Sequence, residues 1–149
     1  NKRLNRNNDG GTTRRTTDIF QLATTVLFQN PVQNFALAPN NLEDVSPVCM
    51  DYMKTIPTTW DETCFIDGYP GKYVVLARRH GGTWYVAAIN AGKETLKLKL
   101  DLEMFAGKTV SLYKDDKKGA PQLVPLKVKE NGKVQLEILP QGGAVLVNK

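Results

Sequence analysis

Hydrophobic residues follow two different periods along the chain. In Thr16–Asn30 they recur at i, i+3, i+4, i+7 and i+8 from Ile19, which is the apolar stripe of an amphipathic helix. In Lys72–Lys149 the period is close to two, which is the alternation of β-strands. The sequence therefore predicts a helical part followed by a β part, with the stretch Ile56–Thr63 between them.

The helical part has clear start and stop signals. Thr16 or Thr17 can cap the first helix, and Pro31 follows its end because proline cannot continue a helix. A second, shorter helix is expected from the N-cap Ser46 to the residue before Pro57. Two or three such helices do not form a domain alone, because their apolar stripes need a surface that buries them.

The burial of the apolar stripe on the first helix shows which part of the protein supplies the surface that covers it. The β part can supply some of it, and a larger body outside the chain would supply the rest. If such a body is missing, the stripe is expected to lie partly exposed or under a neighbouring molecule. Its diagnostic residues are Ile19, Leu22, Val26 and Leu27.

The β part divides into seven or eight short strands. Tyr73–Ala77 and Thr83–Ile89 are apolar on both faces and flank the turn Arg78–Gly82, so we expect central strands that are covered twice. Val124–Lys129 and Lys133–Leu139 flank Asn131-Gly132, which predicts a hairpin. The other expected segments are the extended stretches Trp60–Ile66, Thr95–Leu100, Thr109–Tyr113 and Ala144–Asn148, and the hydrophilic loop Lys114–Gly119. The predicted fold class is mostly β, an antiparallel β-sandwich preceded by two or three helices.

The net charge of +5 raises the question of an acidic partner. The lysines are dispersed, however, and alternate with apolar residues in Leu96–Leu100 and Leu126–Lys129. This pattern is typical of the solvated face of a sheet, and lysine on exposed strands also discourages aggregation. No apolar run approaches the roughly 18 residues of a membrane span. We therefore expect no nucleic acid and no membrane as partner.

No complete catalytic site is visible in the sequence. Asp61 and Glu62 are the tempting pair, but adjacent residues on an extended strand point to opposite faces, so a structural role is expected. His80 has no adjacent serine or cysteine and is interpreted as a solvated turn residue. Cys49 and Cys64 are expected to be buried free thiols, with one bridge between them as the alternative. No spacing of His, Cys or acidic residues predicts a metal site or another cofactor.

The aromatic residues give the one weak candidate for ligand binding. Trp84 and Tyr85 could stack on sugar rings, as they would in a carbohydrate-binding module. As neighbours on a strand, one of them faces in and the other faces out or toward a second layer. A core role is the more ordinary expectation, because a small sandwich needs such bulk to fill it.

Four passages resemble the C-terminal end of glycoside hydrolase family 97, the α-glucosidases and α-galactosidases typical of gut Bacteroidetes. They are Gly11–Thr17 leading into Gln21–Ala23, Phe28–Gln33, Met53–Thr63, and Lys72–Arg79 followed by Trp84–Val86. The most specific passage is Ile56–Thr63 followed by the hairpin. The chain departs from the family at Phe20, where members carry His directly before Gln-Leu-Ala, and this leaves the sugar open.

The resemblance implies an architecture. In the family, an N-terminal sandwich precedes a (β/α)8 barrel, and a small antiparallel sandwich follows it. Residues 1–68 would be the last loop and helices of the catalytic barrel with the connecting seam, and residues 69–149 would be the C-terminal sandwich. Since a whole barrel needs about 250 residues, the chain would be a fragment of the enzyme.

The resemblance also implies an activity and partners. The parent enzyme would hydrolyse α-glucosides or α-galactosides, with its catalytic carboxylates and its calcium-binding glutamates upstream of this chain. The chain would then hold no cofactor and be inactive alone. Its partners would be the missing barrel and N-terminal domain, a second copy in a homo-oligomer, and an oligosaccharide for the parent enzyme. A periplasmic or secreted location is implied by the family, while no signal peptide is visible in the chain.

Overall fold

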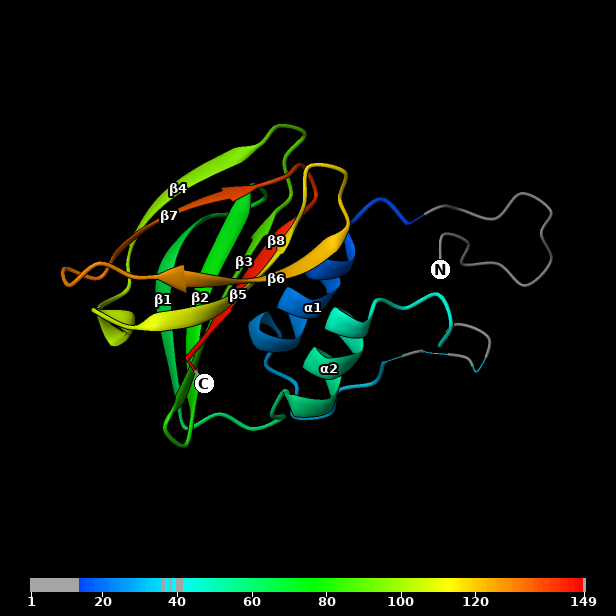
Figure 1. Cartoon of the computed structure of the whole chain (residues 1–149), viewed down its shortest axis with the longest axis horizontal. Helices are drawn as coiled ribbons and strands as arrows, with labels where there is room; N and C mark the ends of the chain where they lie inside the picture. Colours follow the sequence, from blue (N-terminus) through cyan, green and yellow to red (C-terminus); the bar gives the residue numbers. More distant parts are fainter. Residues whose placement is uncertain (1–13, 36, 38, 40–41, 149) are drawn as a thin grey trace.

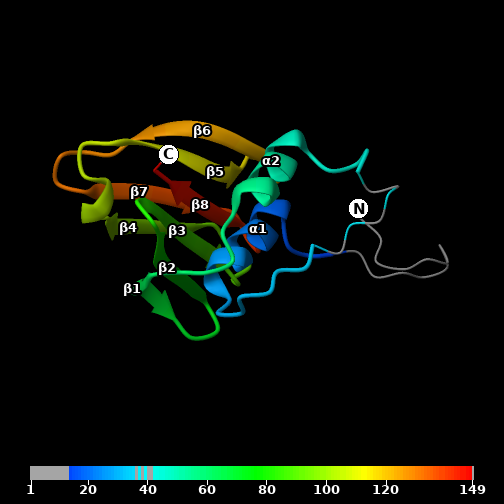
Figure 2. The same cartoon turned by 90° about the horizontal axis from the view of Figure 1, so that it is seen from below.

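The computed structural model describes residues 14–35, 37, 39 and 42–148, which form three layers (Figures 1 and 2). Two helices lie on one face of a six-stranded sheet, and a two-stranded sheet covers the opposite face. Every strand pairing is antiparallel. The predicted class, mostly β with an antiparallel sandwich after two helices, is confirmed. Part of the first family-like passage, residues 11–13, lies outside the described residues.

Both helices begin where the sequence predicts. Helix α1 spans Asp18–Leu27, and the Thr17 hydroxyl caps it by accepting a hydrogen bond from the Phe20 amide at 3.1 Å. The helix ends at Leu27, three residues earlier than expected, because Phe28 already has an extended backbone. Helix α2 spans Pro47–Thr55, with Ser46 as N-cap and proline in its first turn.

The large sheet has the strand order β1-β2-β3-β8-β5-β6. Its strands are β1 Glu62–Tyr69, β2 Tyr73–His80, β3 Thr83–Asn90, β8 Gly143–Val147, β5 Thr109–Asp115 and β6 Pro121–Lys127. The small sheet pairs β4 Leu96–Asp101 with β7 Lys133–Ile138, and a 3-10 turn, Glu103–Phe105, follows β4. Val86, Ala87 and Ala88 are consecutive in β3 and fully buried, so this central strand is covered on both sides as predicted.

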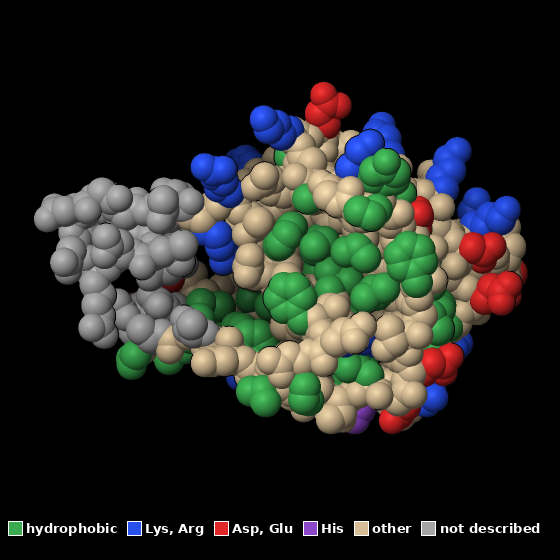
Figure 3. All heavy atoms as spheres, turned by 180° about the vertical axis from the view of Figure 1, so that it is seen from behind, with side chains coloured by type: hydrophobic (Ala, Val, Ile, Leu, Met, Phe, Trp, Pro, Cys, Tyr) green, Lys and Arg blue, Asp and Glu red, His purple; other side chains and the backbone are tan. Residues whose placement is uncertain are grey.

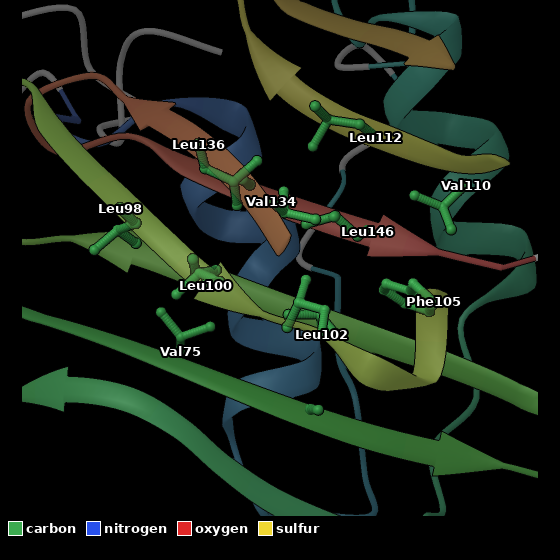
Figure 4. Close-up of a cluster of buried hydrophobic side chains, with 14 of the residues drawn as sticks. Val75, Leu98, Leu100, Leu102, Phe105, Val110, Leu112, Val134, Leu136 and Leu146 are labelled. Carbon is green, nitrogen blue, oxygen red and sulfur yellow. The ribbon is translucent and has the colours of Figure 1, made fainter. Parts of the chain in front are cut away.

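The first core lies between the two sheets. Along β7, Val134, Leu136 and Ile138 are buried while the residues between them are exposed, which is the alternation expected of a sheet with one wet face. Figure 4 shows Leu102 and Phe105, from the segment after β4, among the labelled side chains of this core. The short 3-10 turn therefore fills the interior at one end of the sandwich.

The second core lies between α1 and the other face of the large sheet. Ile19 and Val26 are completely buried, and Leu22 and Leu27 are nearly so. The expectation that this stripe lies exposed or under another molecule is wrong. The reason is that β3 and β8 present small and β-branched residues outward, chiefly Ala87, Val145 and Val147, on which the helix rests.

The contact between α1 and β8 is unusually close at one residue. A Cβ atom added to Gly143 would lie 2.8 Å from the Phe20 Cα atom and 2.9 Å from the Ile19 carbonyl oxygen. These are backbone atoms, so a side chain there would push the helix away from the sheet. Gly143 therefore sets the distance between the two layers.

A buried carboxylate also joins the helix to the sheet, at the start of α1. One carboxylate oxygen of Asp115, at the end of β5, accepts hydrogen bonds from the Thr17 hydroxyl at 2.8 Å and the Gly143 amide at 3.2 Å. The other oxygen is buried without a partner among the described residues. Burial raises the Asp115 pKa above its ordinary value, and the two hydrogen bonds oppose that shift. The predicted loop Lys114–Gly119 is thus wrong at its start, because β5 extends to Asp115.

Two predicted turns also differ from the structure. β2 continues through Arg78 to His80, so the hairpin turn is only Gly81-Gly82. Asn131-Gly132 does form a tight turn, in which the Gly132 amide donates to the Lys129 carbonyl at 2.9 Å. The predicted hairpin across it is wrong, because β6 pairs with β5 and β7 pairs with β4. The turn carries the chain from one sheet to the other.

We expect Gly143→Ala to lower the free energy of unfolding by about 1–3 kcal/mol, because the new methyl group meets backbone and the layers must separate. The measurement is urea unfolding followed by circular dichroism. Gly82→Ala is the matched control, because a Cβ at Gly82 would meet nothing within 4 Å. Equal stability of the two variants would contradict the close contact.

We expect Asp115→Asn to change how stability depends on pH. The folded pKa of Asp115 lies above the unfolded value near 3.8, so the native state binds the proton more tightly. The unfolding free energy of the wild type relative to Asp115→Asn should therefore rise as the pH falls through the folded pKa, and level off below 3.8. Asp116→Asn is the control of opposite sign, because hydrogen bonds from the Ala120 and Lys118 amides lower the Asp116 pKa. Urea unfolding across the pH series measures both.

Candidate functional site

The stretch between α2 and β1 is the chain's most distinctive motif, and it packs against the strand ends of the large sheet. The ring of Trp60 meets Tyr85 edge to face, with 5.3 Å between the ring centroids. The guanidinium carbon of Arg78 lies 5.7 Å from the Trp60 centroid, close enough for a cation–π contact. Trp60, Arg78 and Tyr85 therefore form one cluster at the seam.

Arg78 is the unexpected member of this cluster, because the sequence placed it in an exposed turn. It is only 2% exposed, and its Nη1 donates to the Phe28 carbonyl oxygen at 2.8 Å, just after the end of α1. Its Nε has no partner among the described residues. Burial lowers the Arg78 pKa, but an arginine stays charged in proteins. The charge thus lies at the negative end of the α1 dipole and joins the helix to the sheet.

Asp61 and Glu62 have the structural role that was predicted, although by a different geometry. The Asp61 carboxylate accepts a hydrogen bond from the Gly81 amide at 2.7 Å, and Arg79 pairs with Asp61 at 3.5 Å and with Glu62 at 3.2 Å. Both carboxylates therefore meet one guanidinium, and the expected opposite orientation is wrong. Strand β1 begins only at Glu62, so the alternation rule does not extend to Asp61.

His80 is the other side chain that the sequence analysis considered for catalysis. His80 is exposed at the end of β2, and its Nδ1 lies 2.9 Å from the Thr59 carbonyl oxygen. The sequence predicted His80 in the middle of a turn, whereas it is the last residue of strand β2. Nothing in this contact pairs His80 with a nucleophile.

Trp84 and Tyr85 face opposite sides of β3, as predicted. Tyr85 is 7% exposed and lies in the core between the helices and the sheet. Trp84 is half-buried, packs against the core between the sheets, and has the Arg79 guanidinium 6.0 Å from its ring. Sugar stacking at this pair stays a prediction, and Trp84 is the ring that keeps exposed surface for it.

The two cysteines are free in the structure, so the alternative of a bridge is wrong. Cys49 lies on the buried face of α2, and burial raises its pKa to about 11. Cys64 lies on β1 and is only half-buried, which corrects the expectation that both thiols are buried. Burial and the neighbouring Glu62 carboxylate raise the Cys64 pKa as well.

A pocket of about 520 Å³ lies between α1, α2 and the connection that joins them. Arg14 and Asp18 form an ion pair at its wall, and Cys49 contributes a thiol that stays protonated near neutral pH. Across the described residues, no group of three or more His, Cys, Asp and Glu side chains could hold a metal ion. Hydrolysis of a glycoside needs two carboxyl groups about 5–9.5 Å apart across the bond, one of them free to act as acid. The pocket offers Asp18, already paired with a guanidinium, and the exposed Asp44.

The two thiols are expected to react at very different rates. At about pH 8, Ellman's reagent should modify Cys64 in the folded chain and Cys49 only after unfolding, because the buried thiol holds its proton. Absorbance of the released thiolate with and without urea measures this. The Cys64→Ser variant should show no fast reaction, and a fast reaction that survives in this variant would contradict the burial of Cys49.

Solved structures of glycosidases share this arrangement. A β-arabinopyranosidase crystal structure is 82% identical over 99% of the chain with a TM-score of 0.94, and the match covers 24% of that protein. A glycoside hydrolase family 97 enzyme from Pseudoalteromonas sp. strain K8, in complex with panose, is 23% identical over 92% of the chain with a TM-score of 0.78. The likeness to the Pseudoalteromonas enzyme establishes a common fold. The β-arabinopyranosidase also has the same amino acid at most positions of this chain.

The curated sequence relatives are glycosidases as well. A retaining α-galactosidase of Bacteroides thetaiotaomicron is 31% identical over 85% of the chain, and a probable retaining α-galactosidase of Streptomyces bingchenggensis is 35% identical over 50%. The chain spans 20% of the first relative and 12% of the second. Residues 59–148 match the family model described as glycosyl-hydrolase 97 C-terminal, oligomerisation. The chain therefore belongs to the C-terminal domain family of glycoside hydrolase family 97.

Proposed function

We propose that the chain is the non-catalytic C-terminal module of a glycosidase. The observation that carries this proposal is the match to the β-arabinopyranosidase, which covers 99% of this chain but only 24% of that protein. The chain's own carboxylates support it, since Asp61 and Glu62 are held by Arg79 and Asp18 by Arg14. The catalytic pair then belongs to the part of the enzyme that this chain does not contain.

The substrate class that we propose is a sugar of galacto configuration. L-Arabinopyranose has the ring configuration of D-galactopyranose and lacks only its hydroxymethyl group. A β-arabinopyranosidase and the retaining α-galactosidases among the relatives can therefore share one mode of sugar recognition. The α-glucosides that the sequence also suggested have weaker support, because the enzyme bound to panose is only 23% identical to this chain.

The helical part supplies the contact with the catalytic body in this proposal. The connection between α1 and α2 exposes four large hydrophobic side chains, and the pocket of about 520 Å³ opens beside them. The four residues are Phe28, Val32, Leu37 and Leu42. A long connection that carries such side chains is typical of a segment that packs against another body. The division into a barrel end at residues 1–68 and a sandwich at 69–149 stays a prediction, and β1 belongs to the large sheet across that boundary.

Three further properties of the parent enzyme rest on family membership. We propose that it binds an oligosaccharide, that it holds calcium through residues outside this chain, and that it acts in the periplasm or after secretion. Because Cys49 and Cys64 are free thiols, no disulfide between them requires an oxidising compartment. No helix of the described residues is long and apolar enough to cross a bilayer.

The test is an activity assay of the isolated chain beside the 82%-identical β-arabinopyranosidase. With nitrophenyl β-L-arabinopyranoside and nitrophenyl α-D-galactopyranoside, we expect turnover by the enzyme and none by the chain. The chain itself should be folded, with a cooperative thermal transition, so that inactivity is not a consequence of unfolding. Turnover by the folded chain that survives Asp61→Asn and Glu62→Gln together, and is lost in Asp18→Asn, would place catalysis in the pocket and overturn the proposal.

A further inference from the structure

The helices leave one part of the large sheet uncovered. Helix α1 rests mainly on β3 and β8, and α2 reaches β6 at the far edge. β1, the other edge strand, is not among the strands on which the helices mainly rest. Figures 1 and 2 place β1 and β2 at the back of the first view, and Figure 3, which looks from behind, shows hydrophobic side chains gathered in the middle of that face.

Four side chains on the helix side of β1, β2 and β3 make up the Phe65 surface. Phe65 pairs with Leu76, and Val74 pairs with Ile89, so all four lie on one side of the sheet. Phe65 is 68% exposed, while the other three are half-buried. Gly68 leaves room for the Phe65 ring, because a Cβ there would lie 3.2 Å from that ring. An exposed apolar patch of this kind marks an interaction surface.

The other free strand edges carry residues that oppose association. β4 and β7 alternate apolar residues with exposed charged or polar ones, and Lys99 and Lys133 line a groove of about 550 Å³ beside β6. β6 contains Pro121 and Pro125, which cannot donate to a neighbouring strand. The centre of β1, Cys64–Ile66, contains neither proline nor lysine. β1 therefore lacks the prolines and lysines that protect the other edges, and a bulge between Phe65 and Asp67 is its own interruption of edge pairing.

Charged side chains lie at both ends of β1. Asp61 and Glu62 share one arginine at its start, which leaves one negative charge in excess. Lys72 follows its end and contacts the Tyr69 ring, and the described residues give it no carboxylate partner. When two copies meet about a two-fold axis with antiparallel β1 strands, the Asp61–Glu62 pair of each copy faces Lys72 of the other, and Asp67, near the end of β1, offsets part of that attraction.

We infer that the Phe65 surface is where a second copy of this chain docks, through the same surface about a two-fold axis. The inference rests on the proposed function as a C-terminal module, whose family description names oligomerisation, and it names the contact. All four residues of the Phe65 surface fall within 59–148, the segment whose family description names oligomerisation, while Phe28, Val32, Leu37 and Leu42 fall outside it. A bulge between Phe65 and Asp67 interrupts the register of β1, so side chains carry the contact and a continuous sheet does not.

The experiment is sedimentation equilibrium of the whole chain at about 1, 10 and 100 µM. The wild type is expected to form a reversible dimer, and Phe65→Lys to raise the dissociation constant at least about tenfold, because the central apolar anchor is lost. Phe65→Leu keeps the apolar contact and should keep the dimer. Leu123→Lys is the matched control: Leu123 is 45% exposed on the opposite edge strand, and its substitution should leave the dimer unchanged.

Hydrogen exchange checks the same contact without a substitution. Amides of Glu62–Tyr69 should exchange more slowly as the wild-type concentration rises, while those of Pro121–Lys127 should not change. A thermal transition like that of the wild type shows that Phe65→Lys is folded. A wild type that stays monomeric at about 100 µM, or a dimer that Phe65→Lys leaves intact, overturns the inference.

The outcome separates this inference from the proposed function. A folded chain that is inactive and monomeric disproves the docking surface and leaves the non-catalytic module in place, with the catalytic body as the remaining cover for Phe65. A chain that dimerises through Phe65 but hydrolyses glycosides disproves the proposed function and leaves the docking surface in place. A dimer broken by Leu123→Lys and not by Phe65→Lys places the contact on β6, against the inference.

Discussion

The close contact of α1 with the outer face of the large sheet is the constraint on which the rest of the structure depends. It requires small residues on both sides: Gly143 and Ala87 in the sheet, and Ala23 in the helix. Because the helix lies so near, its whole stripe is buried within the chain, and β3 and β8 become fully interior strands. The position of α1 also fixes that of Phe28, whose carbonyl oxygen is the one that Arg78 binds. The position of the Arg78 cluster therefore depends on the contact between α1 and the sheet.

Local signals in the sequence were sufficient for most of the elements. A threonine cap, a proline in the first turn and alternating residues act within a few positions, so Thr17, Pro47 and the strand β4 could be placed correctly. The partners of these elements could not be derived in the same way. Asn131-Gly132 forms the tight turn that its residues favour, but nothing local decides whether the next strand returns to the same sheet. That choice depends on the buried face of β7 meeting the large sheet, which is a long-range contact.

The candidate site shows the same division. Asp61 and Glu62 could be recognised as structural from their spacing, yet their common partner Arg79 comes from β2, across the sheet. Arg78 was missed because an Arg-Arg-His-Gly-Gly run reads as a polar turn. A signal was present in the sequence: two glycines are enough for a hairpin turn, so the residues before them can continue the strand. Alternation along β2 from the buried Val75 and Ala77 would then have placed Arg78 on the side of the helices.

The layers of the molecule give its two large exposed apolar regions different origins. In the described part of the connection after α1, Phe28, Val32, Leu37 and Leu42 stay exposed, because this segment lies on the outer side of the two helices, beside the pocket between them. The Phe65 surface is exposed because two helices of 10 and 9 residues cannot cover a sheet of six strands. Since α2 covers the β6 edge, the uncovered edge is necessarily β1. A sheet wider than its helical layer therefore keeps one apolar edge for contact with another body. On the small sheet, lysines alternate with apolar residues, so the outer face of that layer is solvated.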